Sequence, residues 1–337
     1  MVRCTMLRNP ELVLRPESAL LAVTAVWGGT FLVVHTAVAH SGPLFFVGLR
    51  FVLAGLLGLV VFGRRLRGIT RADMGAGLAI GAMMAVAYSL QTFGLQTISS
   101  SASAFITALY VPLVPVAQWA IFRKAPGVMS WVGVVLAFVG LMLLAGGTGG
   151  GIGFGTGELA TVIGAVACAG EIVLIGFFAG RVDIARVTII QLLAGGVFCF
   201  AAMPVAGEAV PSFSWVWLGA ALAMASASIV IQLTMNWAQR HVSPTRATVI
   251  YAGEPVWAGI FGRLAGDRLP PAALLGGVLI VLGVLVSEWR PRSRRAVEKG
   301  VTPVTATANE PGIGVVDRLD PPPGVLGAAA GCDVANR

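Results

Sequence analysis

The sequence predicts an all-α polytopic membrane protein, and two observations lead to this prediction. The 337 residues are 57% hydrophobic and 11% charged, whereas a soluble domain carries about 25% charged residues. Ten apolar segments, each close to the ~20 residues that a spanning helix needs, follow one another along the chain. They cover residues 18–37, 44–62, 72–96, 102–122, 128–146, 157–179, 185–206, 214–238, 244–264 and 271–289. Because backbone groups in lipid must be bonded internally, we expect these segments to be helices.

Arginine and lysine gather in alternate connections between the apolar segments. Basic residues precede the first segment and follow the second, fourth, sixth, eighth and tenth; the other connections carry none, except the last, which has Arg268. Since such a bias sets the orientation of membrane proteins, we expect a multi-pass protein of the plasma (inner) membrane with both termini in the cytoplasm. The same distribution argues against nucleic acid as the partner of the net charge of +8.

Three segments outside the apolar runs have their own character. Residues 1–17 form a cytoplasmic N-terminal segment without the continuous apolar core of a signal peptide. Residues 147–156 are rich in glycine and lack the Gly-Lys-Ser/Thr ending of a phosphate loop, so we expect an extracytoplasmic linker. Residues 291–337 are rich in Pro, Gly, Ala and Thr, a composition typical of a disordered cytoplasmic tail.

The two halves of the membrane part resemble each other. A shift of 143 residues aligns Pro112 with Pro255, Gly133 with Gly276 and Gly140 with Gly283, and a shift of 141 aligns Arg50 with Gln191 and Thr30 with Glu171. Each half, 18–146 and 157–290, then holds five helices, and an odd number forces opposite orientations. Inverted repeats are an architecture of secondary transporters, whose binding site lies near the membrane midplane between the halves. The alternative is a chance match between ten unrelated helices.

Short motifs strengthen the comparison. They are Trp27-Gly-Gly-Thr-Phe31, Arg50-Phe-Val-Leu-Ala54, the stretch 88–104, Trp131–Gly140, Glu254-Pro-Val256, Gly266-Asp267 and Gly276–Gly283. In this order, over residues 18–290, the chain resembles the EamA-domain transporters of the drug/metabolite transporter superfamily. The resemblance implies ten helices in two inverted repeats, cytoplasmic termini and, usually, export of small metabolites.

The chain departs from the family pattern at two places. The family's Gly-Glu near the end of the fourth and ninth helices is Gly266-Asp267 in the second half and Arg123-Lys124 in the first. The sixth helix reads Ala-Cys-Ala-Gly-Glu171 and lacks the family's Trp-Gly. The second departure indicates that the two halves contribute unequally to the site.

Polar residues inside the apolar segments predict a shared hydrated cavity, because they recur at helical spacing on five segments. A carboxylate at this depth normally faces such a cavity or a partner, and Glu254 lies in the middle of its segment. The candidate cavity and substrate-binding residues are Trp27, Arg50, Tyr88, Gln91, Tyr110, Glu171, Gln232, Asn236, Tyr251 and Glu254.

Specific roles follow for the charged members. Glu254 is the main proton-coupling candidate and Glu171 the second. Arg50 is either a counter-charge for one of these acids or a ligand for a carboxylate of the substrate. The alternatives are a structural salt bridge at Glu254, a snorkelling or packing arginine at Arg50, and polar stripes that serve only as interhelical hydrogen bonds.

The function predicted is secondary transport, as an exporter, of small organic solutes such as amino acids, metabolites or drugs, by alternating access around a midplane cavity. No ATP motif is present, so an ion gradient, with protons as the candidate ion, or the solute's own gradient drives it. The expected partners are the solute and the bilayer, with a homodimer as an option. The scattered cysteines and histidines predict no metal and no cofactor, and they argue against an intramembrane enzyme, which is one alternative function. A non-transporting membrane sensor or scaffold is the other alternative.

Overall fold

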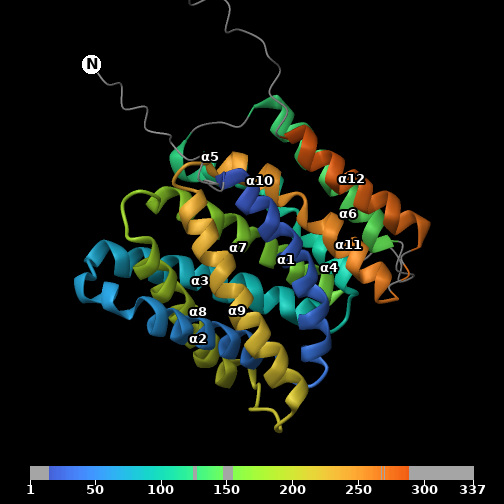
Figure 1. Cartoon of the computed structure of the whole chain (residues 1–337). Coiled ribbons are helices and arrows are strands. Elements are labelled where there is room, and N and C mark those ends of the chain that lie inside the picture. The colour runs from blue at the N-terminus through green and yellow to red at the C-terminus, as the bar shows by residue number, and fades with distance from the viewer. Residues whose placement is uncertain (1–14, 124–126, 147–154, 267, 269, 288–337) are drawn as a thin grey trace, which may run out of the picture. The chain divides into compact units, whose positions relative to one another are not determined.

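The computed structural model describes residues 15–123, 127–146, 155–266, 268 and 270–287. Within these residues every regular element is a helix (Figure 1). The elements are α1 (Pro16–Val38), α2 (Pro43–Phe62), the 3-10 helix η1 (Gly63–Gly68), α3 (Arg71–Gly94), α4 (Ser100–Thr107), α5 (Tyr110–Phe122), α6 (Val128–Gly146), α7 (Thr156–Phe178), α8 (Ile184–Ala206), α9 (Trp215–Ala238), α10 (Pro244–Tyr251), α11 (Glu254–Leu264) and α12 (Pro271–Ser287). Almost all of the predicted N-terminal segment and linker, and the whole tail, lie outside the described residues.

Seven helical stretches of the described chain are long and apolar enough to cross a membrane. They are Pro16–Val38, Pro43–Gly68, Arg71–Gly94, Ser100–Ile121, Thr156–Phe178, Ile184–Ala206 and Trp215–Ala238. Two shorter apolar helices, Trp131–Gly140 and Leu274–Gly283, lie within α6 and α12. The described part of the chain is therefore all-helical, and its long apolar helices agree with the predicted polytopic membrane protein.

Two of the predicted segments differ from continuous helices. The segment at 102–122 divides into α4 and α5, and the segment at 244–264 into α10 and α11. A proline follows each interruption: Pro112 would meet the carbonyl of Ala108, and Pro255 that of Tyr251, without an N–H to offer. The backbone passes both points with tighter i to i−3 bonds, from the Val111 nitrogen to Ala108 (3.0 Å) and from the Gly253 nitrogen to Ile250 (3.1 Å).

Helices far apart in the sequence pack against each other. Helices α2 and α3 lie on α8, α3 also lies on α7, α1 lies on α9 and α11, and α6 pairs with α12 (Figure 1). Buried apolar side chains from both parts of the chain, Phe51, Met84, Ile172 and Leu192 among them, form one core. The helices before residue 147 are thus held mainly by those after residue 154.

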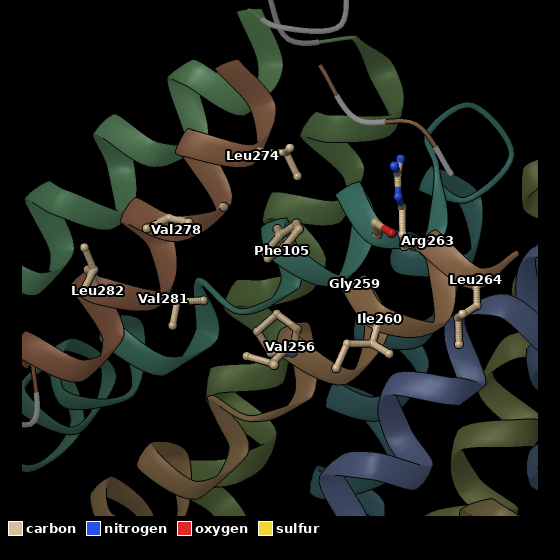
Figure 2. A pocket seen from close by; sticks show the side chains of 13 residues that line it. Phe105, Val256, Gly259, Ile260, Arg263, Leu264, Leu274, Val278, Val281 and Leu282 are labelled. Atoms are coloured by element: carbon tan, nitrogen blue, oxygen red, sulfur yellow. The ribbon is translucent and has the colours of Figure 1, made fainter. Parts of the chain in front are cut away.

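Helices α11 and α12 follow each other in sequence but enclose an open groove between them, with α4 as its floor (Figure 2). Phe105 of α4 fills the base of the groove, where it lies against Gly259 of α11 and Gly277 of α12. The absence of side chains at these two glycines lets the aromatic ring approach both helices.

At both ends of α2, carboxylates form hydrogen bonds between the helices before residue 147 and those after residue 154. Near its start, the Glu208 carboxylate accepts hydrogen bonds from the backbone nitrogens of Leu44 (3.0 Å) and Phe45 (2.6 Å). These are two of the N–H groups that a helix leaves free at its first turn. The carboxylate comes from the connection between α8 and α9, so it ties that connection to α2.

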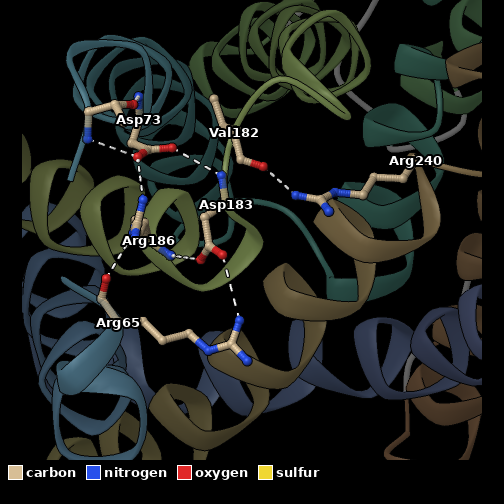
Figure 3. Close-up of polar contacts among 7 residues, drawn as sticks. Arg65, Asp73, Val182, Asp183, Arg186 and Arg240 are labelled. Atoms are coloured by element: carbon tan, nitrogen blue, oxygen red, sulfur yellow. Dashed lines mark hydrogen bonds and ion pairs between the residues drawn. The ribbon is translucent and has the colours of Figure 1, made fainter. Parts of the chain in front are cut away.

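At the other end of α2, Asp73 joins three elements (Figure 3). Its carboxylate caps α3 by accepting from the Thr70 nitrogen (2.9 Å), and it accepts from the Asp183 nitrogen (3.0 Å) just before α8. Arg186 forms an ion pair with the same carboxylate at 3.4 Å and donates to the Arg65 carbonyl of η1 at 2.8 Å. Asp73 is 2% exposed, and buried polar groups of this kind need all their partners.

Glycines allow α6 and α12 to approach closely, and the contact is reciprocal. A Cβ on Gly140 would lie 2.6 Å from the Gly276 carbonyl oxygen, and a Cβ on Gly283 would lie 2.7 Å from the Gly133 carbonyl oxygen. Close approach through small residues replaces the hydrophobic driving force that helices lack in lipid.

We predict that Gly140→Ala lowers the free energy of unfolding by about 1–3 kcal/mol, because the new methyl group meets backbone atoms that cannot move aside. Gly75→Ala is the matched control, since a Cβ at Gly75 meets nothing within 4 Å and alanine is the better helix former by about 0.5–1 kcal/mol. Equilibrium unfolding in mixed micelles measures both. Equal stability of the two variants would contradict the close contact between α6 and α12.

Candidate functional site

Glu254 lies at the first residue of α11, directly after the interruption that divides the helix. It is 1% exposed, and the Tyr110 hydroxyl donates a hydrogen bond to its Oε2 at 2.8 Å. Tyr110 is itself the first residue of α5, after the other interruption. The same hydroxyl lies 3.4 Å from the carbonyl of Tyr251, which Pro255 leaves without its helical partner. The two interrupted helices therefore meet at one carboxylate.

Trp27 of α1 completes this cluster. Its ring stacks on Tyr110 at a centroid distance of 6.5 Å and meets Tyr251 edge-on at 5.7 Å. The neighbouring Gly28 explains the approach of α1: a Cβ there would lie 2.6 Å from the Trp257 Cβ and 2.8 Å from the Ala258 nitrogen of α11. The Trp-Gly-Gly motif thus seats an aromatic ring beside Glu254 and fits α1 against α11.

Arg50 of α2 is buried, with 2% of its surface exposed. Its guanidinium carbon lies 4.7 Å from the ring centre of Phe51 and 4.8 Å from that of Tyr88, so two aromatic faces hold the cation. Its Nε has no hydrogen-bond partner, and none of the ion pairs found among the described residues includes Arg50. Arg50 therefore forms no direct ion pair with Glu171 or Glu254 among the described residues, while the charges of Arg50 and Glu171 still attract each other at longer range.

Glu171 of α7 accepts a hydrogen bond from the Gln232 side-chain nitrogen at 2.9 Å. The Gln232 oxygen accepts from Gln191 at 2.8 Å, and the Gln191 oxygen accepts from Asn236 at 3.2 Å. The Asn236 nitrogen also donates to the Thr188 hydroxyl at 3.1 Å. An ionised carboxylate only accepts, so it fixes the direction of every amide behind it. All five side chains are buried.

A small cavity of about 10 Å³ lies between these groups, space for roughly a single water molecule. It is lined by Trp27, Thr30, Arg50, Phe51, Tyr88, Gln91, Met224, Ser228, Ile231 and Gln232. Gln91 is fixed by its donation to the Thr107 hydroxyl at the end of α4, at 3.1 Å. The cavity therefore connects the guanidinium, the aromatic rings and the start of the amide chain.

All ten residues that the sequence selected are buried. Trp27, Arg50, Tyr88, Gln91 and Gln232 line the cavity. Tyr110, Tyr251 and Glu254 form the cluster beside Trp27, and Glu171 and Asn236 belong to the amide chain.

Sequence reasoning did not select Gln191, Thr188 or Thr107 as site residues. A signal for the first existed, because Gln191 aligns with Arg50 under the shift of 141 residues and follows Thr188 by about one helical turn. For Thr107 the spacing gave only a helix face.

The sequence is similar to those of known membrane transporters. The model of the EamA-like transporter family matches residues 15–146 and again 155–289. An uncharacterized transporter of Archaeoglobus fulgidus is 29% identical over 278 residues, covering 81% of this chain and 86% of the relative. The uncharacterized inner membrane transporter YedA of Escherichia coli K12 is 29% identical over 283 residues, covering 80% and 89%.

A solved structure titled "Crystal structure of protein" shares the fold, with a TM-score of 0.60, 17% identity, and coverage of 81% of this chain and 97% of that one. The resemblance that the sequence motifs indicated is confirmed by the family match over both parts of the chain. The protein belongs to the EamA-like transporter family, within the drug/metabolite transporter superfamily of membrane transporters.

Proposed function

We propose that this protein is a secondary transporter that exports a small organic solute by alternating access around the buried cavity. The observation that carries the proposal is Arg50: a buried guanidinium on the cavity wall that forms no direct ion pair among the described residues. A buried charge is costly unless a partner compensates it. An anionic group of a bound solute would compensate the charge of Arg50 while the solute occupies the cavity.

The solute class follows from the same geometry. A carboxylate would take the guanidinium of Arg50, and an apolar or aromatic body would contact Trp27, Phe51 and Tyr88 on the cavity wall. The acids Glu171 and Glu254 suit an amino group. Amino acids, other carboxylate-bearing metabolites and drugs of this character are therefore the expected solutes.

The architecture we propose is ten spans in two inverted five-helix repeats, 18–146 and 157–290. Three features support it. The interruptions before Tyr110 and Glu254 fall one residue apart under the shift of 143 residues. The glycine contacts between α6 and α12 are reciprocal under the same shift, and the family model matches twice. Interrupted helices at a central site are typical of transporters built in this way.

Coupling to protons would use the two acids in different ways. Glu254 accepts from Tyr110 across the two interruptions, so its protonation would remove the negative charge that holds the pieces together. Glu171 holds a chain of amides in one direction, and its protonated form would donate to Gln232 and let that chain reverse. We assign the main coupling role to Glu254 and the second to Glu171. A homodimer stays a prediction.

The basic connections place both termini in the cytoplasm in this proposal. We expect a single cysteine at His40, in a background without Cys4, Cys168, Cys199 and Cys332, to react with an impermeant maleimide applied to intact cells. A cysteine at Arg67 of η1 should react only after permeabilisation; both positions are exposed. Labelling of Arg67→Cys in intact cells together with protection of His40→Cys would invert the topology.

The direct test is solute counterflow in liposomes, with a panel of zwitterionic, anionic and neutral solutes. Arg50→Gln should raise the KM for carboxylate-bearing solutes about 10- to 100-fold, since a charge-assisted hydrogen bond contributes about 1.5–3 kcal/mol. Arg64→Gln, on the exposed η1, is the control and should leave the KM unchanged. Folded protein without counterflow of any solute would favour a sensor or scaffold, and chemical conversion of a solute would favour an enzyme.

A second test addresses the acids. Glu254→Gln should abolish the stimulation of transport by a pH gradient while counterflow continues, because an amide cannot carry a proton between the two sides. Glu171→Gln should reduce the stimulation in part. Glu17→Gln is the control, because Glu17 and its partner Arg246 are exposed at the surface and such pairs contribute little. Full stimulation in Glu254→Gln would leave Glu254 a structural residue.

A further inference from the structure

The groove between α11 and α12 has a volume of about 860 Å³, within the range of sites that hold small molecules. Its walls are exposed apolar side chains, three from each helix: Val256, Ile260 and Leu264 of α11, and Leu274, Val278 and Leu282 of α12. Figure 2 shows Phe105 between the two helices that carry these rows. The groove is long and apolar, which suits a chain rather than a polar solute.

Only Ser101 and Arg263 among the lining residues carry polar side chains. Arg263 lies in the last turn of α11 and is exposed. In Figure 2 the Arg263 side chain extends from α11 toward the side of the groove on which Leu274 lies. No ion pair of the described residues includes it. An apolar channel that ends at a cation without an ion-pair partner among the described residues matches an amphiphile with a negatively charged head.

The length of the groove matches one leaflet of a bilayer. From Val256 to Leu264 the helix rises about 12 Å at 1.5 Å per residue, and half of the ~30 Å hydrocarbon core is about 15 Å. Arg263 would then lie at the level of the lipid headgroups, where basic residues pair with phosphate. The other end of the groove reaches Pro255, next to the interruption between α10 and α11.

We propose that this groove is a binding site for an anionic phospholipid, with one acyl chain between α11 and α12 and the phosphate on Arg263. In the proposed topology the lipid comes from the outer leaflet. The site is separate from the central cavity, because the two share no lining residue. The inference does not depend on which solute is transported.

The test uses the full chain in nanodiscs of phosphatidylcholine that contain a small fraction of a photoreactive lipid. The reactive diazirine is on the acyl chain of either phosphatidylglycerol or phosphatidylcholine, and mass spectrometry identifies the labelled peptides. We expect phosphatidylglycerol to label the peptides of α11 and α12 about fivefold more than phosphatidylcholine does, the preference typical of one basic residue at a charged headgroup. Arg263→Gln should remove this preference, whereas Arg64→Gln should keep it.

A second variant tests occupation of the groove itself. Val278→Trp fills the space between the two rows and should reduce the labelling of α11 and α12 by either lipid. Val60→Trp, at a residue 84% exposed on α2, should leave that labelling unchanged. Thermal unfolding of all variants checks that they are folded. Equal labelling of the groove and of the surface around Val60 in the unaltered protein would mean non-specific lipid contact and would overturn the proposal, as would crosslinks between two copies of the chain in place of lipid labelling.

Discussion

Inside a bilayer every backbone N–H and C=O must find its hydrogen-bond partner within the protein. Two prolines inside predicted spans, Pro112 and Pro255, prevent one such backbone hydrogen bond each. Each proline removes one donor and turns away from a carbonyl four residues earlier. One of these carbonyls is that of Tyr251, and it lies 3.4 Å from the Tyr110 hydroxyl. Because Tyr110 also begins α5 and Glu254 begins α11, the two interruptions are placed against each other. The Tyr110 hydroxyl donates its single proton to Glu254 at 2.8 Å and thus joins the buried acid to both interruptions.

The close packing of the helices around Glu254 depends on glycines, which have no side chain, rather than on large apolar residues. Gly28 admits α1 to the surface of α11, and Gly140 and Gly283 admit α6 and α12 to each other. Carboxylates perform the equivalent task at the ends of α2, where Glu208 and Asp73 accept backbone N–H groups from the other part of the chain. The centre is therefore surrounded by contacts that are fixed at both ends of the bundle, while α11 and α12 leave an open groove on one side.

The sequence predicted the helices and the buried polar faces well, because both depend on properties local to one segment. Apolar length marks a span, and the spacing of Gln232 and Asn236 marks one face of a helix. Partners across helices were harder to predict. For Arg50 the sequence left open a counter-charge for an acid, a ligand for a substrate carboxylate or a packing role, and it did not indicate the contacts with the rings of Phe51 and Tyr88, since periodicity gives the face of a residue and not its neighbour. The interruptions at 108–109 and 252–253 were missed although their prolines were noted, because a proline in a membrane helix is often tolerated without a break.

The two buried acids, Glu254 and Glu171, differ in their hydrogen-bond partners. This difference determines which contacts a change of charge at each acid would affect. In the proposed two-repeat arrangement the counterpart of Glu254 is Val111 and that of Glu171 is Thr30, so both carboxylates would belong to the second half and Arg50 to the first. Glu254 meets the first half directly, through Tyr110. Glu171 is bonded within the second half, through amides on α8 and α9. A change of charge at Glu254 therefore acts on the contact between the halves, whereas a change at Glu171 acts first on the packing of α7, α8 and α9. Both acids thus lie after residue 154, but only Glu254 is hydrogen-bonded to a residue before residue 147.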